Sequence, residues 1–132
     1  MLSATKTLIP ESAIDYLDEK AYRYDVEGVN GFIHVVIHDF ELPKGYDVAK
    51  ADLLLRLPAG YPNAQPDMFW THPDIKHNGT FPNAADAHDV NYKGKSWQRW
   101  SRHFAHAPWR PGVDGLRSYV ALVQKELQKG SR

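Results

Sequence analysis

The chain has 132 residues, no cysteine, and sixteen basic side chains balanced by sixteen acidic ones. A hydrophobic content of 42% at this length supports one contiguous core, so we expect a single domain over residues 1–132. The lack of cysteine excludes disulfides, thiolate metal sites and a thioester on the chain as given, and the balanced charge gives no general attraction to nucleic acid or an anionic membrane.

The N-terminal segment lacks the apolar stretch and the small-residue cleavage site of a secretory signal. No apolar run in the sequence approaches the ~20 residues that span a bilayer, so we expect a cytoplasmic protein without membrane attachment. The first predicted element is a short helix over residues 10–20, where Ile14 and Leu17 are spaced for one helical face.

Four β-strands are predicted between residues 21 and 72, where β-branched and aromatic residues alternate with Gly and Pro connections. The four runs are AYRYDVE, GFIHVVIHDFEL, ADLLLRL and MFWTH. A turn over residues 28–31 joins the first two runs, and Pro58 ends the third. This order predicts an α+β fold with a helix followed by a four-stranded antiparallel meander.

The C-terminal half is predicted to be a long ordered loop followed by a helix. Between Asp74 and Pro111 the sequence has no regular period and is rich in Gly, Asn, Pro, His and Trp. Loops of this length inside compact domains are usually functional or disordered, and the aromatic content argues against disorder. The apolar stripe of the final helix comprises Val113, Leu116, Tyr119, Val120, Val123 and Leu127.

A spaced series of Pro, Tyr and His residues connects the third predicted strand to the loop. The series is Leu57-Pro58, Tyr61-Pro62, Pro66, Phe69, His72-Pro73-Asp74 and Gly79, with Trp109-Arg110-Pro111 downstream. It resembles the centre of a ubiquitin-conjugating enzyme, and over residues 10–128 the chain is most similar to the bacterial branch of that superfamily called prokaryotic family E. The resemblance implies the ubiquitin-conjugating fold, with its helix, meander, active-site loop and second helix. Most residues of the series are interpreted as determinants of the fold.

The family's catalytic cysteine is missing, and two spacings give different positions for its replacement. Counting back about eight residues from Trp109, as the family spacing implies, leads to Ser101. The spacing from Gly79 leads instead to Phe81 and Pro82. Because Pro82 has no nucleophilic atom, Ser101 is the predicted nucleophile.

A serine hydroxyl needs a positioned base to become nucleophilic. We favour His103, and the alternatives are His106, His72, His77 and His88. The family's His-Pro-Asn is thought to supply a donor to the oxyanion, but this sequence has Asp74 there, which accepts hydrogen bonds and would repel an oxyanion. Asn78, Asn83 or backbone N–H groups could substitute, while Asp74 could orient a histidine or cap a turn.

The predicted catalytic residues are therefore Ser101, His103 and Asp74, and the predicted binding residues are Trp97, Trp100, His72 and Asn78. The resemblance implies that an activating enzyme transfers a ubiquitin-like protein to Ser101 as an oxyester, or as a thioester if the natural residue is cysteine. An amine of a target protein then accepts it, in a bacterial pathway that could serve defence against phage. The alternative is a catalytically inactive conjugating-enzyme-like module that binds a ubiquitin-like protein or a partner enzyme.

Two other chemistries are disfavoured. The seven histidines include no His-Glu-x-x-His, and His72-x4-His77 and His103-x2-His106 are only the nearest approximations to a ligand spacing. Because cysteine is also missing, we expect no metal or other cofactor. Arginines interleave with tryptophans between residues 97 and 110 in a way that could stack single-stranded nucleic acid. The zero net charge argues against that partner.

Overall fold

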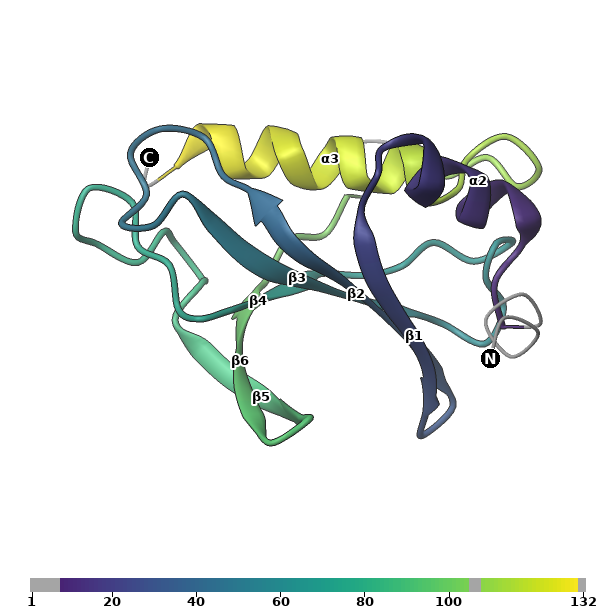
Figure 1. Ribbon diagram of the computed structural model, residues 1–132, viewed down its shortest axis with the longest axis horizontal. Helices are drawn as coiled ribbons and strands as arrows, with labels where there is room; N and C mark the ends of the chain where they lie inside the picture. Colours follow the sequence, from purple (N-terminus) through teal and green to yellow (C-terminus); the bar gives the residue numbers. More distant parts are fainter. Residues whose placement is uncertain (1–7, 105–107, 131–132) are drawn as a thin grey trace.

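The computed structural model describes residues 8–104 and 108–130. Within these ranges the chain forms helices α2 (Glu11–Glu19) and α3 (Leu116–Lys129) and strands β1 (Arg23–Val29), β2 (Phe32–Glu41), β3 (Lys50–Leu57), β4 (Phe69–His72), β5 (Ala87–Tyr92) and β6 (Lys95–Trp100). The strands make one antiparallel sheet in the order β1-β2-β3-β4-β6-β5, and both helices lie on one face of it (Figure 1). No helix in the described ranges is long and apolar enough to cross a membrane.

Both predicted helices are present, and each buries the apolar face that its spacing indicates. On α2 the buried face includes Ile14 and Leu17. The buried residues of α3 are Leu116, Tyr119, Val120, Val123, Glu126 and Leu127. The predicted stripe was wrong at Val113, which is 67% exposed, because it lies in a turn before the helix begins.

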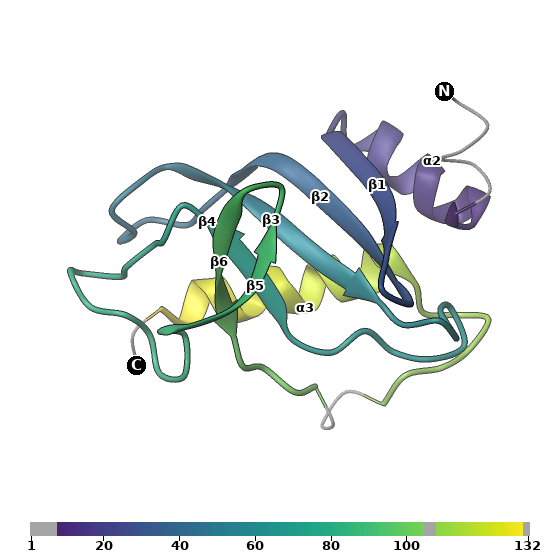
Figure 2. The ribbon, with the colours of Figure 1, turned by 90° about the horizontal axis from the view of Figure 1, so that it is seen from below.

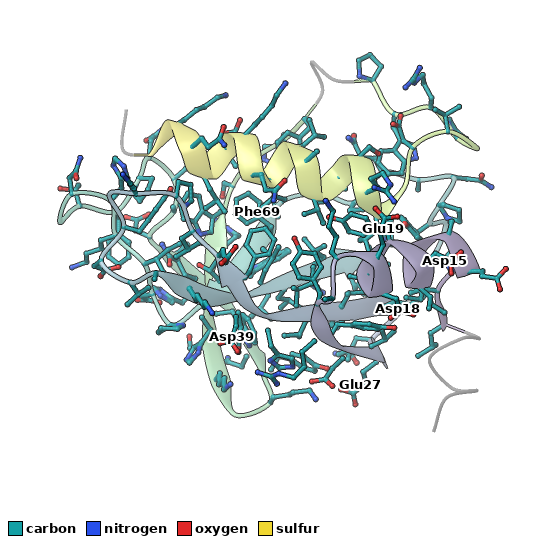
Figure 3. The ribbon with its side chains drawn as sticks, turned by 45° about the horizontal axis from the view of Figure 1, so that its top comes forward. Asp15, Asp18, Glu19, Glu27, Asp39 and Phe69 are labelled. Atoms are coloured by element: carbon teal, nitrogen blue, oxygen red, sulfur yellow. The ribbon has the colours of Figure 1, made fainter. Side chains whose placement is uncertain are left out.

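The main core fills the space between the sheet and the two helices. In β3, Leu53, Leu55 and Leu57 belong to this core while Leu54 belongs to a cluster on the other face, as the two-residue period of a strand requires. Phe69 of β4 lies between the sheet and α3 (Figure 3). Burying each such side chain contributes roughly 1.5–3 kcal/mol, so this layer supplies most of the stability.

The prediction of an irregular loop between Asp74 and Pro111 was wrong, because β5 and β6 form a hairpin there and the described sheet has six strands rather than four. The hairpin crosses the face of the sheet that the helices leave open (Figure 2). It forms a second apolar cluster, whose buried members are Val36, Leu54, Trp70, Val90, Tyr92 and Trp97. Few residues in each strand are apolar, and an irregularity between Ala87 and Val90 interrupts the alternation that would have predicted β5.

The two sheet edges approach each other across this second cluster. Tyr92 Oη donates a hydrogen bond to the carboxylate of Glu27 in β1. Lys93 Nζ lies 3.9 Å from Asp25, and Lys95 Nζ lies 4.0 Å from Asp52. Glu27 is labelled in Figure 3 on the side of the sheet away from α3. The β5–β6 hairpin is therefore tied to both β1 and β3, and its position is fixed by contacts far apart in sequence.

Candidate functional site

Ser101 directly follows β6, and the backbone around it is fixed by neighbouring segments. Its N–H donates to the carbonyl of Ala84 at 3.0 Å, and the Arg102 carbonyl accepts from the N–H of Met68 at 3.2 Å. Trp100 points into the main core, so strand alternation directs Arg99 and Ser101 to the opposite face. Ser101 is half-buried there.

The Ser101 hydroxyl is held by a chain of charged groups. Arg99 Nε donates to Ser101 Oγ at 3.1 Å, and Arg99 Nη1 donates to Asp89 Oδ2 at 2.7 Å. Trp70 Nε1 donates to the other oxygen of Asp89 at 3.1 Å. Although burial raises the pKa of Asp89, hydrogen bonds from Trp70 and Arg99 hold it below its ordinary value. Ionised Asp89 therefore fixes the guanidinium beside the hydroxyl.

Sequence reasoning missed Arg99 as a functional candidate. A signal was available, because residues two apart in a strand share a face and Arg99 precedes Ser101 by two. A cationic donor to a hydroxyl oxygen favours the anionic form of that oxygen. Arg99 thus gives the Ser101 oxygen a cationic hydrogen-bond donor that is not a histidine.

The predicted base, His103, is engaged elsewhere. Its Nδ1 lies 2.7 Å from Asp67 Oδ1, and both side chains are largely exposed. Within the described residues, no hydrogen bond joins His103 to Ser101. The alternative base His106 lies outside the described residues. The structure thus brings His103 to the start of β4 rather than to the hydroxyl.

Asp74 is paired with His88 of β5. His88 Nε2 lies 2.8 Å from Asp74 Oδ1 and 2.9 Å from Oδ2. Both side chains are partly exposed. This pairing corresponds to one of the two roles considered for Asp74, the orientation of a histidine. When Nε2 carries the proton that Asp74 accepts, Nδ1 of His88 is a proton acceptor.

The aromatic residues expected to bind a partner are buried. Trp97 is 1% exposed and Trp100 is fully buried, and each indole N–H is satisfied internally, by the Tyr92 carbonyl and by Thr71 Oγ1. His72 lies over Trp97 with ring centroids 5.6 Å apart. The two tryptophans are therefore core residues, Trp100 in the main core and Trp97 in the second cluster, and His72 is the more accessible member of the group.

Asn78, the remaining predicted binding residue, lies in an exposed turn. Its backbone N–H donates to the carbonyl of Gly45 at 2.8 Å, and its φ of +52° lies in the left-handed region that Asn tolerates. No hydrogen bond in the described part of the chain joins Asn78 to Ser101. The structure therefore does not bring Asn78 to the hydroxyl.

The comparison with protein families agrees with this architecture. The family model described as prokaryotic E2 family E matches residues 9–130, nearly the whole chain. The chain belongs to prokaryotic E2 family E. It is therefore a conjugating-enzyme-like module, and its α+β sheet with two helices is compatible with an E2-like fold. No curated protein and no solved structure matches the sequence.

A buried glutamine in this E2-family module holds the segment after the His-Pro-Asp turn against β6. Gln98 Oε1 accepts from Thr71 Oγ1 at 3.0 Å and from the Ile75 N–H at 2.8 Å. Its Nε2 donates to the carbonyls of Ile75 and Ala85 at 3.1 and 2.7 Å. Gln98 thus positions the chain on both sides of the 76–84 loop. Sequence reasoning gave it no role, since a single Gln in a loop-like stretch carries no signal.

The histidines of the E2-family module form no metal centre in the described part of the chain. No group of three or more His, Asp or Glu side chains in residues 8–104 and 108–130 could hold an ion. His38 contacts Asp25 and Asp52, at 2.7 and 3.5 Å, on the face opposite the helices. These two carboxylates account for both ring nitrogens of His38.

Proposed function

We propose that this E2-family chain carries a ubiquitin-like protein as an oxyester on Ser101 and passes it to an amine of a target protein. The observation that supports this best is the half-buried Ser101 hydroxyl, which accepts a hydrogen bond from Arg99 Nε at 3.1 Å. Its partners would be the ubiquitin-like protein, an activating enzyme and the target, in the cytoplasm of a prokaryote.

Loading is an acyl transfer at the Ser101 oxygen. Oγ attacks the carbonyl carbon of the thioester between the ubiquitin-like protein and the activating enzyme, a C–O bond forms and the C–S bond breaks. The sulfur leaves as thiolate, and the serine proton passes to solvent or to the thiolate. The N–H of Arg99 stabilises negative charge on Oγ during the attack.

Discharge reverses the role of the serine oxygen. The target amine attacks the ester carbonyl, a C–N bond forms, and the C–O bond to Ser101 breaks while Oγ regains a proton. We assign the Asp74–His88 pair, rather than His103, as acceptor of the amine proton, because His88 is oriented by a carboxylate.

The absence of cysteine permits a sharp test. The chain is incubated with the activating enzyme, ATP and the ubiquitin-like protein of its source genome, and adducts are separated with and without a thiol reagent. The wild type should give an adduct that resists thiols and is cleaved by base, and Ser101→Cys should give a thiol-sensitive one. Because the sequence has no other cysteine, a thiol-sensitive adduct must form at the substituted position.

The control is the exposed Ser96 of β6, which makes no side-chain hydrogen bond in the described structure. Ser96→Cys should retain the thiol-resistant adduct and gain no thiol-sensitive one, and Ser101→Ala should give none. An adduct that persists in Ser101→Ala would refute the assignment of the nucleophile.

A noncovalent binding module is the second candidate. It is favoured by the pairing of His103 with Asp67, which leaves Ser101 without a histidine partner in the described residues. In that case neither the wild type nor Ser101→Cys forms an adduct, whereas titration calorimetry shows the ubiquitin-like protein binding both chains equally. The two functions therefore give opposite results in one pair of experiments.

A further inference from the structure

Buried polar atoms without a hydrogen-bond partner gather on one face of the sheet. In the described residues, the buried side-chain atoms that lack a partner are Nδ1 and Nε2 of His34, Nε of Arg56 and Nε2 of Gln65. His34 and Arg56 are direct cross-strand neighbours in β2 and β3. Most buried polar atoms in folded proteins have a partner, so a local concentration of unpartnered groups points to a missing ligand.

Arg56 is held between two aromatic rings rather than by a carboxylate. Its guanidinium carbon lies 4.1 Å from the ring centroid of Phe32 and 5.4 Å from that of Trp70. Within the described residues no acidic side chain forms an ion pair with it. Stacking fixes the plane of the guanidinium and leaves its N–H edge for a planar acceptor.

Arg56 and Gln65 line the same small pocket. Its volume is about 150 Å³, and Phe32, Asp67, Met68 and Trp70 form other parts of its wall. This is about five water volumes of roughly 30 Å³ each and lies below the range of roughly 300–1,000 Å³ typical of metabolite sites. The pocket therefore suits one side chain at the surface of a larger molecule.

We propose that this pocket binds the carboxylate of an acidic side chain presented by a partner protein. The guanidinium of Arg56, which has no acidic partner in the described residues, and the side-chain amide of Gln65 would donate to the two carboxylate oxygens. Phe32 is 37% exposed and offers an apolar surface to the methylene groups of the acid. A cation, a second donor and aromatic walls together select a carboxylate over a neutral amide.

Two titratable side chains close to the pocket, Asp67 and His34, are compatible with this ligand. Asp67 is the acidic residue in its wall, and Asp67 Oδ1 is engaged by His103 Nδ1 at 2.7 Å. His34 is 2% exposed and packs edge-on against Tyr92, so it is shielded from solvent beside Arg56. The net charge of the pocket wall is thus not negative.

The pocket adjoins the Ser101 segment, so a partner bound in the pocket would lie near the proposed nucleophile. Met68 in its wall donates to the carbonyl of Arg102, and Trp70 donates to Asp89, the partner of Arg99. A protein anchored by its acidic side chain at Arg56 would cover the face on which Ser101 lies. Binding at Arg56 does not depend on any reaction at Ser101.

NMR of the full chain with arginine side chains labelled with ¹⁵N provides the test. The probe is N-acetylglutamate α-amide, and its matched control is N-acetylglutamine α-amide, which has the same shape without the charge. The glutamate probe should shift the Arg56 Nε–H signal with saturation at millimolar concentrations, and the glutamine probe should not. Equal shifts with both probes, or saturation only with inorganic phosphate, would refute an acidic side chain as the ligand.

Substitutions of the pocket residues test whether the glutamate probe binds in this pocket. Arg56→Gln should weaken binding of the glutamate probe at least about tenfold, as loss of a charge-assisted pair predicts, with backbone amide shifts as the readout. Gln65→Met keeps the volume, removes one donor and should weaken binding several-fold, so it remains informative if Arg56→Gln fails to fold. Arg23→Gln, at an exposed pair with Asp39, is the control and should bind as the wild type does. Unchanged binding in Gln65→Met and in folded Arg56→Gln would overturn the proposal, whatever the outcome at Ser101.

Discussion

At the scale of single residues, burial determines the protonation state of His34. Its ring is 2% exposed, lies 4.4 Å from the Tyr92 ring, and lacks hydrogen-bond partners in the described structure. Burial, with a smaller contribution from the positive charge of Arg56, lowers the pKa of His34 to about 4. The ring is therefore neutral at pH 7, and protonating it in the folded state is unfavourable.

This predicts an acid-sensitive stability. Between the ordinary pKa of about 6.5 and the folded value of about 4, the unfolded chain binds a proton that the folded chain does not. The free energy of unfolding should therefore fall as pH decreases through this window, by about 3 kcal/mol at most. Urea unfolding at pH 7 and pH 4.5 measures the loss. His34→Phe should reduce it, while His103→Gln, at an exposed residue, should leave it unchanged.

Arg99 permits a second prediction at the same scale. If its N–H stabilises charge on Ser101 Oγ, Arg99→Gln should slow adduct formation at least about tenfold, as loss of a donor to a developing anion does in other enzymes. The initial rate of oxyester formation measures the effect, and Arg23→Gln is the matched control. An equal rate in Arg99→Gln would show that Arg99 has only a structural role.

At the scale of elements, the buried Gln98 connects β6 to the segment on either side of the 76–84 loop. Gln98→Leu would remove the acceptor of the Thr71 O–H and of the Ile75 N–H and the donor to the carbonyls of Ile75 and Ala85, at a cost of about 3 kcal/mol. Urea unfolding measures the loss of stability, and faster hydrogen exchange at the Ile75 amide would localise it. Gln124→Leu on the exposed side of α3 should change stability by less than about 0.5 kcal/mol.

Sequence periodicity predicted some elements and not others, for a physical reason. The helices at 10–20 and at the C-terminus and the apolar runs before residue 72 have strong local patterns, and the structure has elements there. The β5–β6 hairpin is stabilised by packing of Val90, Tyr92 and Trp97 against residues of β2 to β4, which no local pattern encodes. Similarly, the partners of Asp74 and His103 lie 14 and 36 residues away, so motif spacing could locate these side chains but not their contacts.

At the scale of the whole molecule, the two apolar clusters share one sheet. Trp100 lies in the main core, and Trp70 and Trp97 lie in the second cluster. The paired strands β4 and β6 contribute residues to both clusters. Unfolding of one cluster would therefore expose the other. The structure thus couples the hairpin to the rest of the domain.

We therefore predict one cooperative unfolding transition for the chain, as expected for a single domain of this size. Tryptophan fluorescence, which reports on both clusters, and far-ultraviolet circular dichroism, which reports on the helices and sheet, should give the same midpoint. An earlier fluorescence transition would show that the β5–β6 hairpin unfolds separately and would contradict the single-domain prediction.

The two outer strands of the sheet determine how other chains can approach it. β1 carries Arg23, Asp25 and Glu27, and β5 at the opposite edge is interrupted by an irregularity after Ala87. Charges and irregularities at sheet edges oppose backbone pairing with a foreign strand. Both borders therefore disfavour β-addition and amyloid-like association, so we expect recognition of this protein to proceed through its side chains.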